Sequence, residues 1–167
     1  SHLLEEYPVK LVLTGFMGSG KSSTGRLVAD HLGKKVHYID LDEAIVSRWC
    51  QSISEMFATV GEAEFRRRER AMLEEILARS GSILLATGGG AMIQDGAEAI
   101  VREKGGRIIL LDVSLETALA RSNGHNTRPL LNQDYNAIVA LYNQRRPLYL
   151  DMADLVINAD LGKAERV

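Results

Sequence analysis

Apolar and polar positions along this chain follow two alternating patterns. Short, continuous apolar runs predict buried strands at residues 9–14, 36–40, 82–87, 107–113 and 155–158. Between these runs, apolar residues recur every three or four positions and predict helices at 21–32, 41–49, 53–60, 61–79, 94–103, 115–121 and 134–149. Buried strands that alternate with helices are typical of a parallel sheet covered on both faces. We therefore expect an α/β fold of three layers, α/β/α, around a central parallel sheet.

One polar stretch breaks this alternation. Residues 122–133 are rich in Asn, Gly and Pro, which predicts a mobile loop. The chain contains no internal repeat and no linker, and its 167 residues suit one compact domain with a substantial core. We expect residues 3–167 to form that single domain.

A glycine-rich string, G-F-M-G-S-G-K-S, lies between the first predicted strand and the first predicted helix. It matches the pattern G-x-x-x-x-G-K-[ST], whose backbone N–H groups surround a polyphosphate at the start of a helix. Lys21 can reach the β- and γ-phosphates, and the Ser22 hydroxyl can ligate Mg²⁺. A chance glycine-rich turn is the alternative, and the flanking strand and helix disfavour it. The residues expected at the nucleotide are Gly15, Gly18, Ser19, Gly20, Lys21, Ser22 and Ser23.

Two strand ends offer an aspartate for the metal, Asp40 and Asp112. Asp42 follows Asp40 by two residues, and in an extended segment such residues point the same way. One carboxylate could then hold the water shell of the metal while the other receives a substrate hydroxyl. The alternative is that these aspartates only cap helices, and we favour capping for Asp112 and the functional role for Asp40 and Asp42.

Charge and composition narrow the class of ligand. A net charge of −2 argues against a general nucleic-acid binder, and no apolar run reaches the length of a membrane span. Arginine supplies 14 of the 20 cations, and its planar guanidinium binds carboxylate and phosphate through two N–H groups, which lysine cannot do. We expect Arg67, Arg68 and Arg70 to be solvated charges on a helix, and the remaining arginines to suit small anionic ligands. A single cysteine and the lack of a visible secretory leader favour the cytoplasm.

Six motifs in fixed order make the sequence similar to the shikimate kinase family from Lys10 to Asn158. These motifs are G-F-M-G-S-G-K-S-S-T-G-R-L-V-A, D-L-D, G-E-A-E-F-R-R-R-E, G-G-G-A, R-P-L-L and R-R-P-L-Y. The resemblance implies a P-loop fold like that of nucleoside monophosphate kinases, ATP as co-substrate and Mg²⁺ as cofactor. It implies phosphorylation of the 3-hydroxyl of shikimate, a step of aromatic amino-acid biosynthesis.

The resemblance also implies a role for each matched residue. Asp40 would hold Mg²⁺ through water, and Asp42 would accept shikimate hydroxyls. Arg66 and Arg145 would grip the substrate carboxylate. The backbone N–H groups of Gly88, Gly89 and Gly90 would face the substrate. Arg121 would lie against adenine, and Arg128 would close on the phosphates.

On this basis the domain divides into functional segments. We expect a core at 8–40 and 80–121, a substrate-binding segment at 41–79, a lid at 122–133 and a closing helix and strand at 134–158. Trp49-Cys50 replaces the small Thr-Gly pair common in the family, so we expect the left-handed turn that glycine permits to be absent there.

Our interpretation is a monomeric, cytoplasmic enzyme whose ligands are ATP and shikimate. Two alternatives remain at this point. One is another small-molecule P-loop kinase, acting on gluconate or a nucleoside monophosphate. The other is a regulatory domain that senses ATP without turnover.

Overall fold

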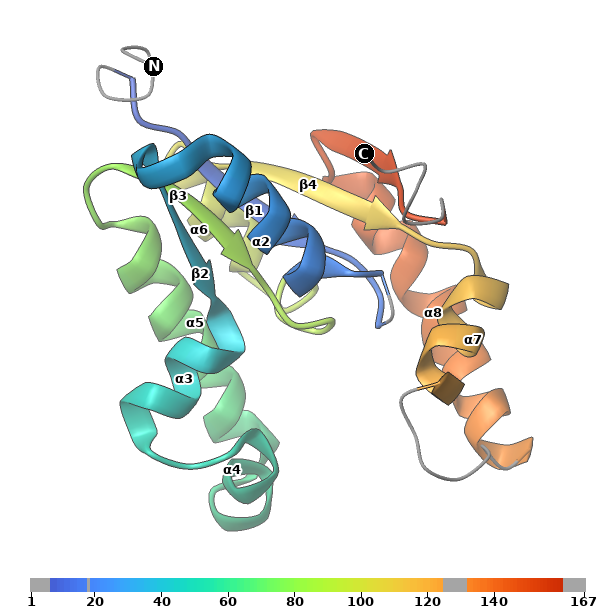
Figure 1. The fold of residues 1–167 in the computed structure, drawn as a ribbon. Coiled ribbons are helices and arrows are strands. Elements are labelled where there is room, and N and C mark those ends of the chain that lie inside the picture. Colours follow the sequence, from blue (N-terminus) through green and yellow to red (C-terminus); the bar gives the residue numbers. More distant parts are fainter. Residues whose placement is uncertain (1–6, 18, 125–131, 161–167) are drawn as a thin grey trace.

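The computed structural model describes residues 7–17, 19–124 and 132–160. These residues form a parallel sheet of five strands in the order β2-β3-β1-β4-β5 (Figure 1). The strands are β1 (Lys10–Thr14), β2 (Val36–Asp40), β3 (Ser82–Ala86), β4 (Arg107–Asp112) and β5 (Leu155–Asn158). All five run in the same direction, so their carboxyl ends meet at one edge of the sheet. The predicted parallel sheet is confirmed.

Helices flank the sheet and connect its strands. Those described are α2 (Lys21–Leu32), α3 (Leu41–Trp49), α4 (Ile53–Thr59), α5 (Gly61–Leu77), α6 (Ala97–Glu103), α7 (Leu115–Gly124) and α8 (Asn132–Met152), with a 3₁₀ turn η1 (Gly33–Lys35) after α2. In Figure 1, α3, α4 and α5 extend below one side of the sheet, and α7 and α8 extend below the other. None of the helices in the described ranges is long and apolar enough to cross a membrane.

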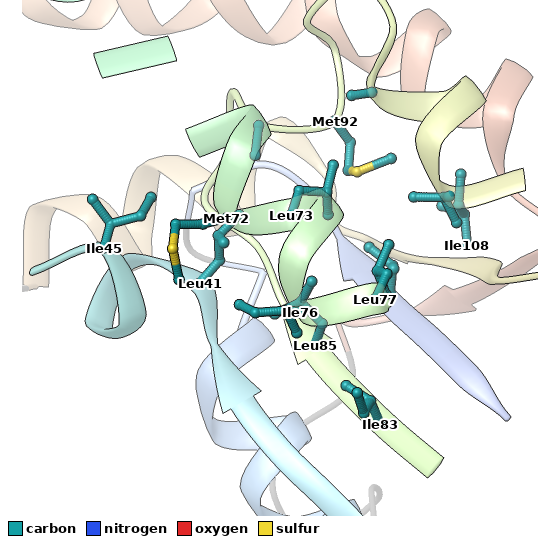
Figure 2. Packing of buried hydrophobic residues seen from close by; sticks show 14 of the residues in the cluster. Leu41, Ile45, Met72, Leu73, Ile76, Leu77, Ile83, Leu85, Met92 and Ile108 are labelled. Atoms are coloured by element: carbon teal, nitrogen blue, oxygen red, sulfur yellow. The ribbon is translucent and has the colours of Figure 1, made fainter. Parts of the chain in front are cut away.

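Side chains that alternate along the strands separate the two faces of the sheet. Val12 of β1 packs on the face that carries α5 and α6, whereas its neighbour Leu13 packs on the face of α2. The larger cluster lies between α5 and the sheet, where Leu73, Ile76 and Leu77 meet strand residues (Figure 2). This burial fixes α5 on the sheet, and α5 carries the arginines of the third motif. The three-layer arrangement follows from the sequence pattern as expected.

The structure corrects the predicted bounds of the polar loop. Helix α7 continues to Gly124 and α8 begins at Asn132, so residues 122–124 and 132–133 of the predicted loop are helical, and residues 125–131 lie outside the described ranges. Helix α8 also continues past Pro147 to Met152. Two residues after that proline, the side chain of Tyr149 is buried. Such tertiary packing outweighs the low helix propensity of proline.

The left-handed turn after α3 is present despite the lack of glycine. Cys50 adopts φ 55° and ψ 36° at the end of the helix, and its N–H donates to the Val46 carbonyl. Among the described non-glycine residues, Cys50 is the one with positive φ. The prediction from Trp49-Cys50 is therefore wrong: the helix end keeps its hydrogen bond, and a side chain in this region costs about 1–2 kcal/mol.

Candidate active site

The loop between β1 and α2 requires glycine for a steric reason. A Cβ atom on Gly15 would lie 2.6 Å from the Leu111 carbonyl oxygen and 2.9 Å from Ser19 Oγ. The loop closes through the Ser19 N–H, which donates to the Phe16 carbonyl at 3.2 Å. Helix α2 starts after Gly20, which has φ 86°, and neither a capping side chain nor an acidic residue of the first turn covers its end. The first N–H groups of α2 can therefore bind an anion. Gly18 lies outside the described residues.

Lys21 is held inside this loop. Its ammonium donates hydrogen bonds to the Gly15 carbonyl at 2.7 Å and to the Phe16 carbonyl at 3.2 Å. Burial lowers the pKa of Lys21 to about 8, with Arg145 acting in the same direction and Asp42 opposing it. Burial favours the neutral amine, and a polyphosphate bound in the loop would favour the charged ammonium.

Asp40 contacts the loop from the end of β2. Its Oδ2 accepts a hydrogen bond from Ser22 Oγ at 3.0 Å, and its Oδ1 accepts one from the Glu43 N–H at 3.1 Å. Asp40 therefore caps α3 and also lies beside the Ser22 hydroxyl, so capping does not exclude a role at the phosphate loop. A hydroxyl and a carboxylate are the oxygen ligands that suit Mg²⁺. No group of three or more His, Cys, Asp or Glu side chains among the described residues could hold a metal, so phosphate and water would complete such a site.

The second candidate aspartate has a different partner. Asp112, at the end of β4, accepts two hydrogen bonds from Arg146 of α8, at 3.0 and 2.8 Å. The cap of α7 is Ser114, whose Oγ accepts a hydrogen bond from the Thr117 N–H at 3.1 Å. Asp112 is thus paired with an arginine and does not cap α7, so the capping prediction for Asp112 is wrong. Arg146, one of the arginines expected to suit small anionic ligands, is thus paired with a carboxylate of the protein.

Three predicted substrate groups meet around the triple glycine that follows β3. A Cβ atom on Gly88 would lie 3.1 Å from Asp42 Oδ2, and one on Gly89 would lie 3.4 Å from Arg145 Nη1. On Gly90 it would lie 2.7 Å from Arg66 Nη2. The glycine backbone is therefore in close contact with one carboxylate and two guanidinium groups, which come from α3, α5 and α8. Such a set can bind a small molecule that carries both an acid and hydroxyl groups.

The arginines of α5 differ in exposure. The side chain of Arg66 is 17% exposed, whereas that of Arg67 is 75% exposed and pairs with Glu64. Arg67 and Arg70 are exposed, as predicted. Arg68 is not, because its side chain is only 14% exposed and its guanidinium lies 5.0 Å from the ring of Trp49. That prediction is wrong because α3 brings an aromatic ring against one side of α5.

Sequence reasoning missed two buried partners of the predicted site. Glu69 accepts a hydrogen bond from Arg66 Nη1 at 2.8 Å, and burial raises the pKa of its carboxyl group while Arg66 lowers it. Tyr149 donates a hydrogen bond to the Gly89 carbonyl. The signals were their spacings on helices, three residues after Arg66 and four residues after Arg145, which place side chains on one face.

Arg121 lies at the carboxyl edge of the sheet, beside the last strand. Its Nη2 donates to the Ala159 carbonyl at 2.9 Å, directly after β5. Arg128, which is predicted to contact the phosphates, lies outside the described residues.

Comparison with known proteins identifies the family of this chain. A family model described as shikimate kinase matches residues 17–167. A shikimate kinase of Pseudomonas paraeruginosa is 42% identical over 154 residues, which cover 91% of this chain and 87% of the relative. One from Xylella fastidiosa is 40% identical over 152 residues, covering 90% and 82%.

Solved structures show the same relationship. A shikimate kinase from Acinetobacter baumannii in complex with shikimate has a TM-score of 0.83 and 31% identity, covering 96% of this chain and 89% of that one. A gluconokinase from Sinorhizobium meliloti has a TM-score of 0.60 at 16% identity, covering 95% and 87%, which is a likeness of fold alone. Because the family model and the curated relatives cover most of its length, this chain belongs to the shikimate kinase family.

Proposed function

We propose that this chain transfers the γ-phosphoryl group of ATP to the 3-hydroxyl of shikimate, giving shikimate 3-phosphate and ADP. The observation that carries the proposal is the meeting of Asp42, Arg66 and Arg145 around the backbone of Gly88–Gly90. Shikimate is a small acid with several hydroxyl groups. Two arginine forks suit its carboxylate, and one carboxylate suits its hydroxyls.

Asp42 is the group we assign to the reacting hydroxyl. Burial raises the pKa of this carboxyl group most, Asp40 raises it further, and Lys21 and Arg66 lower it. A carboxylate with a raised pKa is a better proton acceptor than an exposed one. Phosphoryl transfer leaves little covalent work for the protein, so orienting the hydroxyl is the main task that we give to Asp42.

Lys21 and the end of α2 would stabilise the phosphates on the opposite side of the transferred group. The proximity of the phosphate loop to the triple glycine supports this arrangement, because a Cβ atom on Gly89 would lie 3.9 Å from the Gly15 carbonyl oxygen, which accepts a hydrogen bond from Lys21. The positive charge of Lys21 would act most strongly as negative charge shifts toward the leaving oxygen.

Mg²⁺ is the metal we propose for the nucleotide. Ser22 Oγ would be a direct ligand, and Asp40 would hold the metal through water. The hydrogen bond between these two side chains supports this, since both oxygens already face one point beside the phosphate loop. When bound, the metal would neutralise phosphate charge during transfer.

The remaining predicted segments are part of the same proposal. Arg121 would lie against adenine, beside the chain after β5. Residues 122–133 would close over the site and bring Arg128 to the phosphates, which would exclude water as an acceptor. Residues 41–79 would form the substrate-binding segment of a single domain, and the enzyme would act as a cytoplasmic monomer without nucleic acid or membrane.

A coupled assay of ADP release tests this function. Purified protein with Mg-ATP should release ADP when shikimate is added, and mass spectrometry should identify the product as shikimate 3-phosphate. Gluconate and AMP serve as alternative acceptors on the same scaffold. Equal ADP release without shikimate, or release with gluconate alone, would rule out the assignment, whereas ATP binding without turnover would indicate a sensor.

A further inference from the structure

Tyr149 lies where helix α8 meets the glycine turn that follows β3. Its side chain is 1% exposed, and its hydroxyl donates a hydrogen bond to the Gly89 carbonyl, 60 residues earlier in the chain. The ring belongs to the cluster that also contains Phe16 of the phosphate loop and Leu110 of β4. The Tyr149 side chain is thus held by apolar packing around its ring and by a hydrogen bond at its hydroxyl.

The same hydroxyl lies beside Arg145. Arg145 is one turn earlier on α8, and its guanidinium lowers the pKa of Tyr149 against the effect of burial. A Cβ atom on Gly89 would lie 3.4 Å from Arg145 Nη1 and 3.9 Å from the Tyr149 hydroxyl. The glycine backbone, the tyrosine hydroxyl and the guanidinium therefore meet at one point. Arg145 Nε is buried there without a hydrogen-bond partner.

The backbone of α8 makes one hydrogen bond fewer near this point than a helix without proline would make. Pro147 lies inside the helix, between Arg145 and Tyr149. Proline has no N–H to donate to the carbonyl one turn earlier, and its ring disfavours a straight helix at that point. A side-chain contact just after the proline can therefore determine where the preceding turn, with Arg145, lies relative to the glycine turn.

We propose that Tyr149 is a positioning residue, which holds Arg145 and the Gly88–Gly90 turn in the mutual arrangement that binds the carboxylate of the acceptor. This inference rests on the proposed function. Tyr149 itself does not touch the reacting atoms. Its removal should therefore weaken acceptor binding and leave the chemical step almost unchanged.

The chain offers a matched control on the same helix. Tyr142 lies two turns earlier, is also buried, and donates its hydroxyl to the Val113 carbonyl at 2.6 Å. Tyr142→Phe and Tyr149→Phe each remove one hydroxyl and leave one carbonyl without that partner. Both should lower the melting temperature by a similar amount, because the chemical loss is the same.

Steady-state kinetics at saturating Mg-ATP separate the two tyrosines. Tyr149→Phe should raise the KM for shikimate at least fivefold, with kcat changed less than twofold and the KM for ATP unchanged. Tyr142→Phe should leave all three values within twofold of the wild type. Equal KM values for shikimate in the two variants, both folded by circular dichroism, would overturn the inference.

A double-mutant cycle with Arg145→Lys tests the route of the effect. If Tyr149 acts through Arg145, Tyr149→Phe should raise the KM less than twofold in the Arg145→Lys background. Full additivity would overturn the inference. A wild-type protein that does not phosphorylate shikimate would overturn the proposed function and this inference together, whereas active wild type with two equivalent phenylalanine variants overturns this inference alone.

Discussion

The Ser22 hydroxyl donates a hydrogen bond to the Asp40 carboxylate at 3.0 Å, across 18 residues of sequence. Ser22 lies in the first turn of α2, and Asp40 is the last residue of β2 and the cap of α3. One short contact therefore joins the phosphate loop to the start of α3, where Asp42 lies. The hydrogen bond between the two proposed metal ligands therefore also helps to position Asp42, the residue proposed to bind the substrate hydroxyl.

Asp40→Asn should separate the metal role of this carboxylate from its capping role. Asparagine caps helices as well as aspartate does, so the free energy of unfolding should change by less than about 0.5 kcal/mol. The Mg²⁺ concentration that gives half-maximal activity should rise at least tenfold, because an amide binds the hydrated metal less well than a carboxylate. Activity titrated with Mg²⁺ at fixed ATP measures this change.

Ser52→Ala is the matched control for Asp40→Asn. Ser52 caps α4 by accepting a hydrogen bond from the Glu55 N–H at 3.1 Å. Its loss should cost about 1 kcal/mol of stability and leave the Mg²⁺ titration unchanged. A wild-type titration curve for Asp40→Asn would show that Asp40 is a cap without a metal role.

Arg66→Lys should raise the KM for shikimate at least tenfold, which corresponds to about 1.4 kcal/mol of binding free energy. Lysine cannot offer the planar fork that pairs with a carboxylate while still bonding Glu69. Arg67→Lys changes the adjacent, exposed residue of the same helix and should have no such effect. Calorimetric titration of both variants with shikimate measures the difference, and equal affinities would show that Arg66 does not bind the substrate carboxylate.

The sequence predicted most of the fold because its signals are local. Continuous apolar runs locate the strands, apolar residues every three to four positions locate the helices, and the string around Lys21 locates the loop between β1 and α2. Asp40 and Asp112 show where local signals fail, since both follow apolar strands. Only the sheet order, with β4 next to β5 and α8, brings Arg146 to Asp112.

The motifs supplied the predicted members of the site, and Glu69 and Tyr149 end two of the same strings without a predicted role. Glu69 and Tyr149 received no role because their importance lies in the groups that they contact after folding, Arg66 and the Gly89 carbonyl. Arg68 illustrates the same limit, because its burial depends on Trp49 of another helix. Pairings of this kind depend on tertiary packing, which periodicity and motif spacing do not encode.

Gly90→Ala should reduce shikimate binding without unfolding the protein. The added Cβ would lie 2.7 Å from Arg66 Nη2 and 3.1 Å from Nη1, so the guanidinium must move. The end of a long side chain can shift at small cost in stability, yet the bidentate geometry toward a carboxylate would be lost. We expect the KM for shikimate to rise about tenfold and the melting temperature to change little. Unchanged shikimate affinity would place the substrate carboxylate away from Arg66.

Lys21 predicts a dependence on pH that differs between free and ATP-bound enzyme. Burial lowers the pKa of its ammonium to about 8, so the free enzyme loses this charge as the pH rises through 8. Bound polyphosphate favours the charged form and raises the pKa of Lys21. The value of kcat/KM for ATP should therefore fall above about pH 8, while kcat should fall only at higher pH. Coincident profiles of kcat and kcat/KM would contradict this role.

Lys21→Met tests the same charge through stability and activity. A native pKa of about 8 lies below the ordinary value of 10.5, so the cost of burying the ammonium is present in full below pH 8. Between pH 8 and 10.5 the unfolded chain binds more protons at this residue, and the cost disappears. The unfolding free energy of the wild type, relative to that of Lys21→Met, should therefore rise across this window in denaturant titrations at each pH.

Turnover of the variant should be at least about a hundredfold lower at pH 7, because the charge acts mainly in the transition state. A folded variant with near-normal turnover, or a stability difference that does not change with pH, would show that Lys21 is not the buried cation of the phosphate site.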